Sequence, residues 1–234
     1  MFGHPEFEDR REAGRRLAPA LMHLAQDKPL LLALPRGGVP VAYEVARALD
    51  AELDVLIVRK LAAPGHEELG IGAVIDGSAP QVVLNDDIVR QCGASDTYIE
   101  AETRRQLVEI ERRRRAYRGD TPAPPIAGRT VIVVDDGIAT GGTVTAALRA
   151  LRKGWPKWLV LAVPVAPAST IEALKGECDE IVCLYQPDPF YAVGAHYSEF
   201  RQTGDAEVVE LLGAASRFGR SSITATALSS KEKE

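Results

Sequence analysis

The chain of 234 residues lacks the features that mark several protein classes. No stretch approaches the roughly 18 continuous apolar residues of a membrane-spanning helix. The first 16 residues are charged and lack the apolar core of a secretion signal, and no internal repeat is present. We therefore expect a cytoplasmic protein without a membrane partner, and neither a transmembrane helix bundle nor a repeat architecture.

Cysteine is scarce, and positive charge is not in excess. Cys92, Cys178 and Cys183 have no spacing typical of a metal site, so we expect three unpaired thiols. The net charge is −5, which gives no electrostatic case for nucleic acid or for an anionic membrane as partner. The four consecutive arginines at 112–115 could contact a polyanion. Glutamates within the same predicted helix favour a salt-bridged, solvated helical face instead.

Apolar segments with strand and helix periodicity alternate along the chain. The pattern predicts an α/β protein with an open, doubly wound, mainly parallel sheet, whose ligands bind at the carboxyl ends of the strands. Helices are predicted at 6–26, 39–49, 86–91, 95–118, 143–153 and 169–175, strands at 30–34, 53–58, 131–134, 157–163 and 180–184, and a hairpin from 70–75 and 81–84.

The most informative run spans residues 131–144 and reads VIVVDDGIATGGTV. Its β-branched start predicts a strand buried on both faces, and the end predicts a helix whose first amide groups are free to bind an anion. Asp135 and Asp136 lie between them, where carboxylates can accept hydrogen bonds from sugar hydroxyls. The combination indicates a pocket for a phosphorylated sugar.

Two different kinds of site fit this run less well. A P-loop needs a Lys directly after its last Gly, and Thr143 stands there. A phospho-acceptor aspartate after a strand explains neither the paired acids nor the Thr/Gly loop. An ordinary strand-to-helix turn remains the structural alternative.

The run resembles the signature that binds phosphoribosyl pyrophosphate (PRPP) in type I phosphoribosyltransferases. The resemblance implies that Asp135 and Asp136 hold the ribose hydroxyls, directly or around Mg²⁺. It also implies that the loop after them holds the 5-phosphate, through Ala139, Thr140, Gly141, Gly142 and Thr143.

The resemblance also carries expectations about the whole chain. We expect one phosphoribosyltransferase domain over residues 1–213, with a core at about 28–185 and a small hood built from 1–27 and 186–213. Residues 214–234 lack periodicity and are expected to form a disordered tail. A homodimer is compatible with these expectations.

A second loop, LPRGGVP at 34–40, directly follows the first predicted strand. Consecutive glycines allow the backbone to approach a ligand closely, and Arg36 supplies a cation. In the resembled family this loop grips the pyrophosphate, often through a non-proline cis peptide, so Arg36, Gly37 and Gly38 are expected to do so here. The sequence leaves open whether Arg36–Gly37 is cis, and an ordinary turn between strand and helix is the alternative.

Arg59 and Lys60 close the next predicted strand. Two cations at the same rim suit a pyrophosphate leaving group, and Lys60 is counted with the catalytic residues. Residues 61–70 have the Pro/Gly composition of a mobile lid, and the arrangement resembles that of adenine phosphoribosyltransferases. Basic residues at strand ends are also common on ordinary surfaces.

The base is expected to stack on Phe190 or Tyr191, since PDPFYAVG at 187–194 resembles a segment of hypoxanthine-type phosphoribosyltransferases. An aromatic pair covering the core is the alternative. Two other features depart from that subfamily. Ala139 replaces its third Asp, and residues 163–167 lack its Lys. The loop at 139–143, which reads ATGGT, resembles the adenine subfamily more closely.

The resemblance therefore implies a Mg²⁺-dependent transfer of ribosyl 5-phosphate from PRPP to a nucleobase-like nitrogen heterocycle. A regulatory protein that binds PRPP or a nucleotide without turnover is one alternative, and a sugar-phosphate hydrolase or phosphatase is another.

Overall fold

The computed structural model, which describes residues 5–77 and 80–219, is built around a five-stranded parallel sheet. The strand order is β2-β1-β6-β7-β8, and each neighbouring pair is parallel, as predicted. The strands are β1 (Leu30–Ala33), β2 (Glu52–Val55), β6 (Thr130–Val134), β7 (Trp158–Val165) and β8 (Glu180–Tyr185). The strand that carries the signature, β6, is therefore the central one.

A second, antiparallel sheet follows β2, in the order β3 (Val58–Ala63), β4 (His66–Ile75) and β5 (Gln81–Leu84). The predicted pairing of 70–75 with 81–84 is confirmed. The predicted strand at 53–58 is wrong in its end, because β2 stops at Val55 and Val58 already belongs to the other sheet. The predicted loop at 61–70 is also wrong, since β3 and β4 form a hairpin with Pro64 and Gly65 at its tip.

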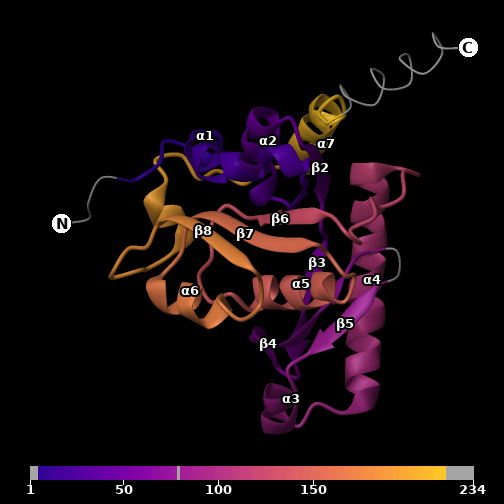
Figure 1. The fold of residues 1–234 in the computed structure, drawn as a ribbon. Coiled ribbons are helices and arrows are strands. Elements are labelled where there is room, and N and C mark those ends of the chain that lie inside the picture. Colours follow the sequence, from indigo (N-terminus) through magenta and orange to yellow (C-terminus); the bar gives the residue numbers. More distant parts are fainter. Residues whose placement is uncertain (1–4, 78–79, 220–234) are drawn as a thin grey trace, which may run out of the picture.

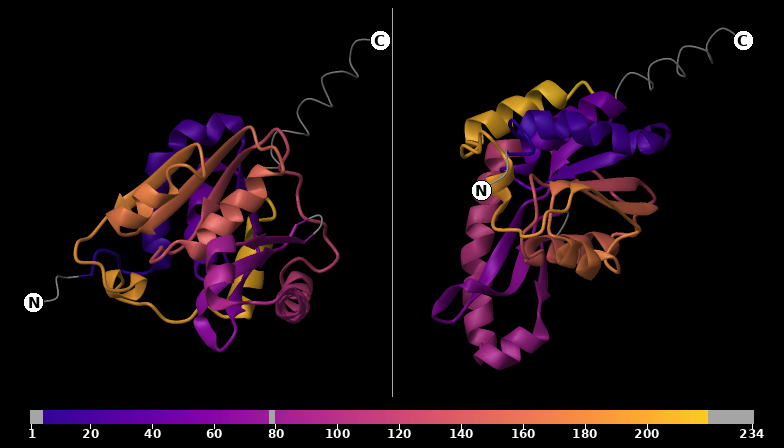
Figure 2. Two further views of the ribbon diagram at one scale, coloured as in Figure 1. Left: turned by 90° about the horizontal axis from the view of Figure 1, so that it is seen from below. Right: turned by 90° about the vertical axis from the view of Figure 1, so that its left-hand side faces the viewer.

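Helices cover both faces of the parallel sheet (Figure 1). On one side lie α1 (Arg10–Leu21), α2 (Gly38–Leu49) and α7 (Asp205–Ala215), which the turned views show stacked together (Figure 2). On the other lie α5 (Gly142–Arg152) and α6 (Ala168–Leu174). The remaining helices are α3 (Asp86–Cys92), α4 (Asp96–Arg118) and the short 3-10 helices η1 (Met22–Asp27) and η2 (Val193–His196).

The first helix shows how a local signal sets a boundary. The expected helix at 6–26 begins only at Arg10, because the Asp9 carboxylate accepts a hydrogen bond from the Glu12 amide and so caps the helix. At its other end, residues 22–27 tighten into η1.

Strand alternation divides the core into two clusters. Ile132 and Val134 of β6 pack with residues of α1, α2 and α7, whereas Val131 and Val133 pack with residues of α5 and α6. The first cluster also contains Leu61 and other buried residues of the hairpin. The hairpin thus shares its core with the parallel sheet.

Two chain segments that are far apart in sequence, around Phe7 and around Tyr197, meet at the carboxyl side of the sheet. Phe7 forms a bridge with Tyr197, and its amide donates to the His196 carbonyl at 2.9 Å. The division into a core and a hood stays a prediction.

The predicted start of the disordered tail at residue 214 is too early. The helix α7 continues to a buried Ala215, and the centre of the Phe218 ring lies 5.6 Å from that of Tyr43. Residues 220–234 lie outside the described residues.

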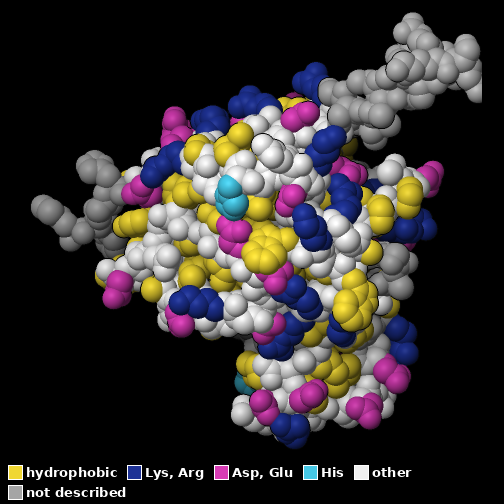
Figure 3. Space-filling model, in the orientation of Figure 1, with side chains coloured by type: hydrophobic (Ala, Val, Ile, Leu, Met, Phe, Trp, Pro, Cys, Tyr) yellow, Lys and Arg dark blue, Asp and Glu magenta, His cyan; other side chains and the backbone are white. Residues whose placement is uncertain are grey.

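The surface and the thiols agree with the sequence analysis. Cys92, Cys178 and Cys183 have free thiols, and acidic and basic side chains intermingle on the face shown in Figure 3. The arginines at 112–115 pair with Glu109 and Glu111, which confirms the salt-bridged helical face. No helix in the described part of the chain has the length and apolar character needed to span a bilayer.

Candidate functional site

Asp135 and Asp136 follow β6 directly, at the carboxyl edge of the parallel sheet. The Asp136 amide donates to Oδ1 of Asp135 at 2.9 Å. Burial, together with the negative charge of Asp136, raises the pKa of Asp135 well above its ordinary value. Two negative charges this close together repel each other, so a bound cation or hydroxyl donors would stabilise the ionised pair.

Arg10 supplies a cation to this pair, and it was not among the residues predicted from the sequence. Its Nε donates to Oδ2 of Asp136 at 2.7 Å, and both side chains are largely buried, with exposed fractions of 11% and 14%. The same helix carries Arg11, Arg15 and Arg16. Nothing in the sequence distinguishes Arg10 from them, because its role depends on which side of α1 faces the sheet.

The loop after β1 lies against the Asp136 carboxylate, a contact that was not predicted from the sequence. A Cβ atom on Gly37 would lie 2.0 Å from Oδ2 of Asp136, and one on Gly38 would lie 2.6 Å from the Val134 carbonyl oxygen. Only glycine allows this approach at either position. The cis peptide bond of the loop is Pro35–Arg36, one bond before the one left open by the sequence.

Arg36 is partly buried and approaches the first residue of α7. Its Nη1 lies 3.7 Å from Oδ1 of Asp205. The Tyr117 hydroxyl also donates to Asp205, at 2.6 Å, and so does Nη1 of Arg112, at 3.1 Å. These hydrogen bonds hold the pKa of Asp205 below its ordinary value. The Arg36 guanidinium is therefore close to a carboxylate of the protein itself, that of Asp205.

The loop from Gly137 to Gly141 leads into α5, whose first residue is Gly142. Gly141 caps the helix with φ of +78°, a conformation that favours glycine. Thr140 and Thr143 are exposed, and Thr170 anchors the loop by donating to the Ala139 carbonyl at 2.6 Å. The amides of a first helical turn lack partners within the helix, so this end of α5 can bind an anion.

The aromatic segment lies next to the same loop. A Cβ atom on Gly137 would be 2.5 Å from Cγ1 of Val193, and the Tyr197 hydroxyl donates to the Asp136 carbonyl. Tyr191 is 71% exposed, while the Phe190 ring stacks on His196 at 5.4 Å. The Tyr191 ring is thus largely exposed to solvent, and the Phe190 ring packs on a neighbouring side chain.

Arg59 and Lys60 are placed differently from the prediction. Both lie within antiparallel β3, and neither ends a strand of the parallel sheet. Nε of Arg59 donates to Gln106 of α4 at 2.9 Å, and the Lys60 stem runs beside Gly70 of β4.

Mg²⁺ fits this site as an ion shared with a ligand. Mg²⁺ keeps several waters and is commonly held by one or two carboxylates together with substrate phosphates. Asp135 and Asp136 provide such a pair. Within residues 5–77 and 80–219, no group of three or more His, Cys, Asp or Glu residues could form a protein-only cage.

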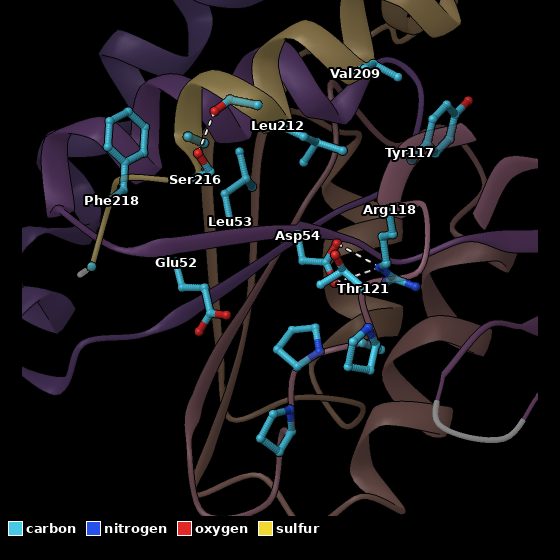
Figure 4. Close-up of a pocket in the computed structure, with 17 residues that line it drawn as sticks. Glu52, Leu53, Asp54, Tyr117, Arg118, Thr121, Val209, Leu212, Ser216 and Phe218 are labelled. Atoms are coloured by element: carbon cyan, nitrogen blue, oxygen red, sulfur yellow. Dashed lines mark hydrogen bonds and ion pairs between the residues drawn. The ribbon is translucent and has the colours of Figure 1, made fainter. Parts of the chain in front are cut away.

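A cavity of about 680 Å³ lies elsewhere, between β2, the end of α4 and α7 (Figure 4). The ion pair of Asp54 and Arg118 lies in its wall. None of its 17 described lining residues belongs to the loops predicted to bind PRPP. It is therefore separate from the candidate site.

Several known proteins are similar to this chain in sequence or fold. The family model for the phosphoribosyl transferase domain matches residues 7–198. A Mycobacterium tuberculosis protein, named provisionally as a phosphoribosyl transferase, is 46% identical over 211 residues, which are 90% of this chain and 47% of the relative. The chain thus spans about half the length of the curated relatives that it matches first.

Two further proteins extend the comparison. A crystal structure of a protein from Thermus thermophilus superposes with a TM-score of 0.75 at 44% identity, covering 88% of this chain and 97% of the other. The adenine phosphoribosyltransferase of M. tuberculosis is 32% identical over 150 residues, 64% of this chain and 53% of that enzyme.

Proposed function

Because the chain belongs to the family of phosphoribosyl transferase domains, we propose that it transfers ribosyl 5-phosphate from PRPP to a nitrogen of a nucleobase-like heterocycle, with release of pyrophosphate. The observation that carries this proposal is the carboxylate pair at the end of the central strand. It lies between a glycine loop in van der Waals contact and a helix N-terminus open to an anion.

The groups of the site divide between the parts of PRPP. Asp135 and Asp136 hold the ribose hydroxyls, and the loop with Thr140 and Thr143 holds the 5-phosphate. Arg36, Gly37 and Gly38 receive the pyrophosphate. Bound Mg²⁺ would neutralise charge on the departing pyrophosphate.

The reaction exchanges one bond at the anomeric carbon. The bond from this carbon to the pyrophosphate oxygen breaks, and its electron pair leaves with the pyrophosphate. The nitrogen lone pair of the acceptor forms the new bond, and the nitrogen then releases its proton to solvent. The transition state has oxocarbenium character, as in glycosyl transfer generally, and the fixed dipoles and cations around it are the main source of stabilisation.

Arg59 and Lys60 are the less direct candidates for the pyrophosphate, and Lys60 for catalysis. Arg59 and Lys60 contact the pyrophosphate only if the β3–β4 hairpin moves toward the carboxyl edge of the parallel sheet when PRPP binds.

For the acceptor we propose an adenine-like base stacked on Tyr191 or Phe190. Ala139 offers no carboxylate to an oxo-purine. Residues 163–165 are buried within β7 and offer no ammonium group. A site without matched polar groups does not select strongly for an oxygen substituent. The similarity to an adenine enzyme supports the same choice.

We place this activity in the cytoplasm, which suits three free thiols. A homodimer is compatible with it.

The test is a pyrophosphate-release screen with PRPP, Mg²⁺ and a panel of purines and pyrimidines. We expect release with adenine-like bases and none from the folded variant with Asp135→Asn and Asp136→Asn. Binding of PRPP without release for any base would favour the regulatory alternative. Formation of ribose 5-phosphate without base would favour the hydrolase, and exclusive use of hypoxanthine or guanine would overturn the base preference.

A further inference from the structure

Arg10 stands out because it reaches the carboxylate pair from a segment far away in the sequence. Besides its contact with Asp136, its Nη1 donates to the Arg201 carbonyl at 2.7 Å, and its guanidinium carbon lies 3.9 Å from the centre of the Phe200 ring. The side chain is thus held on two sides by groups other than the carboxylate. This fixes a permanent positive charge at the centre of the candidate site.

The contact is made to an oxygen with little free space around it. Oδ2 of Asp136 accepts from Nε of Arg10, and the same oxygen is the atom that a Cβ on Gly37 would strike. The glycine loop and the guanidinium therefore enclose Oδ2 from two sides. A divalent cation that needs this oxygen meets both steric and charge competition from Arg10.

We propose that Arg10 is a positioning residue that acts as the counter-ion of Asp136 in the ligand-free protein, and that a divalent cation must displace it from Oδ2. The inference deepens the proposed function and rests on it for the role of the metal. The guanidinium holds the Asp136 carboxylate in its orientation before the substrate arrives. Metal binding is weakened until PRPP supplies further oxygen ligands.

A small cavity beside Arg10 can accommodate the displaced guanidinium. Arg10, Arg201 and Thr203 line a cavity of about 70 Å³. Glu199 and Glu207 also line this cavity, and their carboxylates can hold the guanidinium there without Asp136. Exchange therefore needs a side-chain rotation and no unfolding of α1.

The first test measures the affinity for Mn²⁺ alone by electron paramagnetic resonance, without PRPP or base. We expect Arg10→Gln to bind Mn²⁺ about tenfold more tightly than the unaltered protein, within the range usual for coupled binding events. Arg10→Lys keeps the charge and should stay near the original affinity. Arg15→Gln is the matched control, because Arg15 lies on the same helix, is half exposed and only approaches Glu44 at 3.9 Å.

Equal or weaker binding by Arg10→Gln would overturn the inference, as would the absence of measurable binding in every variant. The assay involves no turnover, so a failed pyrophosphate-release screen would not affect it. If pyrophosphate release succeeds while the Mn²⁺ affinity of Arg10→Gln equals that of the unaltered protein, only this inference is overturned and the proposed function stands.

A second measurement uses the unaltered protein, in case Arg10→Gln does not fold. The side-chain Nε–H resonance of Arg10 is identified by its loss in the spectrum of Arg10→Lys. We expect saturating Mg²⁺ to shift this resonance, because the hydrogen bond to Asp136 is lost. A resonance that stays unchanged at saturation would show that the guanidinium remains in place and would overturn the inference.

Discussion

Gly37 is the residue at which the candidate site leaves least room, because an added methyl group would overlap Oδ2 of Asp136. We expect Gly37→Ala to displace the carboxylate and lower kcat/KM for PRPP about a hundredfold, since misplacement by about 1 Å commonly costs that much. The measurement is steady-state pyrophosphate release. Gly213→Ala is the control, because apart from the adjoining backbone of α7 itself no atom lies within 4 Å of the position that the added methyl group would occupy.

Near-equal kcat/KM values for the two glycine variants would contradict the role of the close approach. A loss in Gly37→Ala that came with global unfolding would show in circular dichroism and would have to be separated from a local effect. The sequence predicted that the backbone at Gly37 and Gly38 approaches a ligand closely, and this stays a prediction. The approach to Asp136 was not predicted, because the carboxylate follows a strand about a hundred residues further along.

Burial makes two of the three thiols poor nucleophiles. It raises the pKa of Cys178 and of Cys183 to about 11. Against an ordinary thiol pKa of about 8.5, this lowers the thiolate fraction near neutral pH by about two orders of magnitude. We expect iodoacetamide at pH 8 to alkylate both far more slowly in the native protein than in the denatured one.

The alkylation is followed by mass spectrometry of peptides over time. The denatured protein, in which all three cysteines react at ordinary rates, is the control. A native Cys183 that reacts as fast as the denatured one would show that its surroundings open readily.

At the scale of elements, Arg118 joins α4 to both sheets. Its Nε lies 2.8 Å from Oδ2 of Asp54 in β2, its Nη1 lies 2.5 Å from Oδ2 of Asp76 after β4, and its Nη2 donates to the Val55 carbonyl. All three charged side chains are nearly buried. Removing the cation would leave two carboxylates without their partner in a site of low polarity.

We therefore expect Arg118→Met to lower the free energy of unfolding by about 3–5 kcal/mol. Urea denaturation is the measurement. Arg115→Met is the matched control on the same helix, since Arg115 is 76% exposed and its pair with Glu111 is worth about 0.5 kcal/mol or less. A cost for Arg118→Met as small as that of the control would mean that the buried cluster contributes little to stability.

The same region shows where sequence reasoning failed. Residues 53–58 form one apolar run, but the chain leaves the parallel sheet at Val55 and enters the antiparallel sheet at Val58. Asp54 lies inside the run, and its partner Arg118 is distant in sequence. Periodicity reports burial, not which sheet buries a residue, so Arg59 and Lys60 were assigned to the wrong edge.

For the whole molecule, the shared core predicts cooperative unfolding. Leu61 and Ile71 of the hairpin belong to the same buried cluster as Val134 of the central strand. We expect a single denaturant transition that coincides for tryptophan fluorescence and for far-ultraviolet circular dichroism. The fluorescence reports on Trp155, which precedes β7, and on Trp158 at its start. Two separated transitions would show that the antiparallel sheet melts as an independent unit.

The overall architecture was predictable because parallel strands carry strong signals. The run at 131–134 is apolar throughout, as expected for a strand covered on both faces, and β6 is indeed buried at every position. Much of the candidate site is local in sequence, since Asp135 to Thr143 form one segment. Arg10 and Asp205 were missed, because each reaches the site only through the packing of a terminal helix.

The bridge between Phe7 and Tyr197 has a practical consequence for protein engineering. Polypeptide fused directly before residue 5 would emerge beside Asp136, because Phe7 and Arg10 are both attached to that neighbourhood. At the other end of the described chain, the amide of Gly219 donates to Asp50 at 3.1 Å, ahead of the amino end of β2 and on the opposite side of the sheet. An affinity tag or a surface-immobilisation handle therefore belongs after α7, away from the neighbourhood of Asp136.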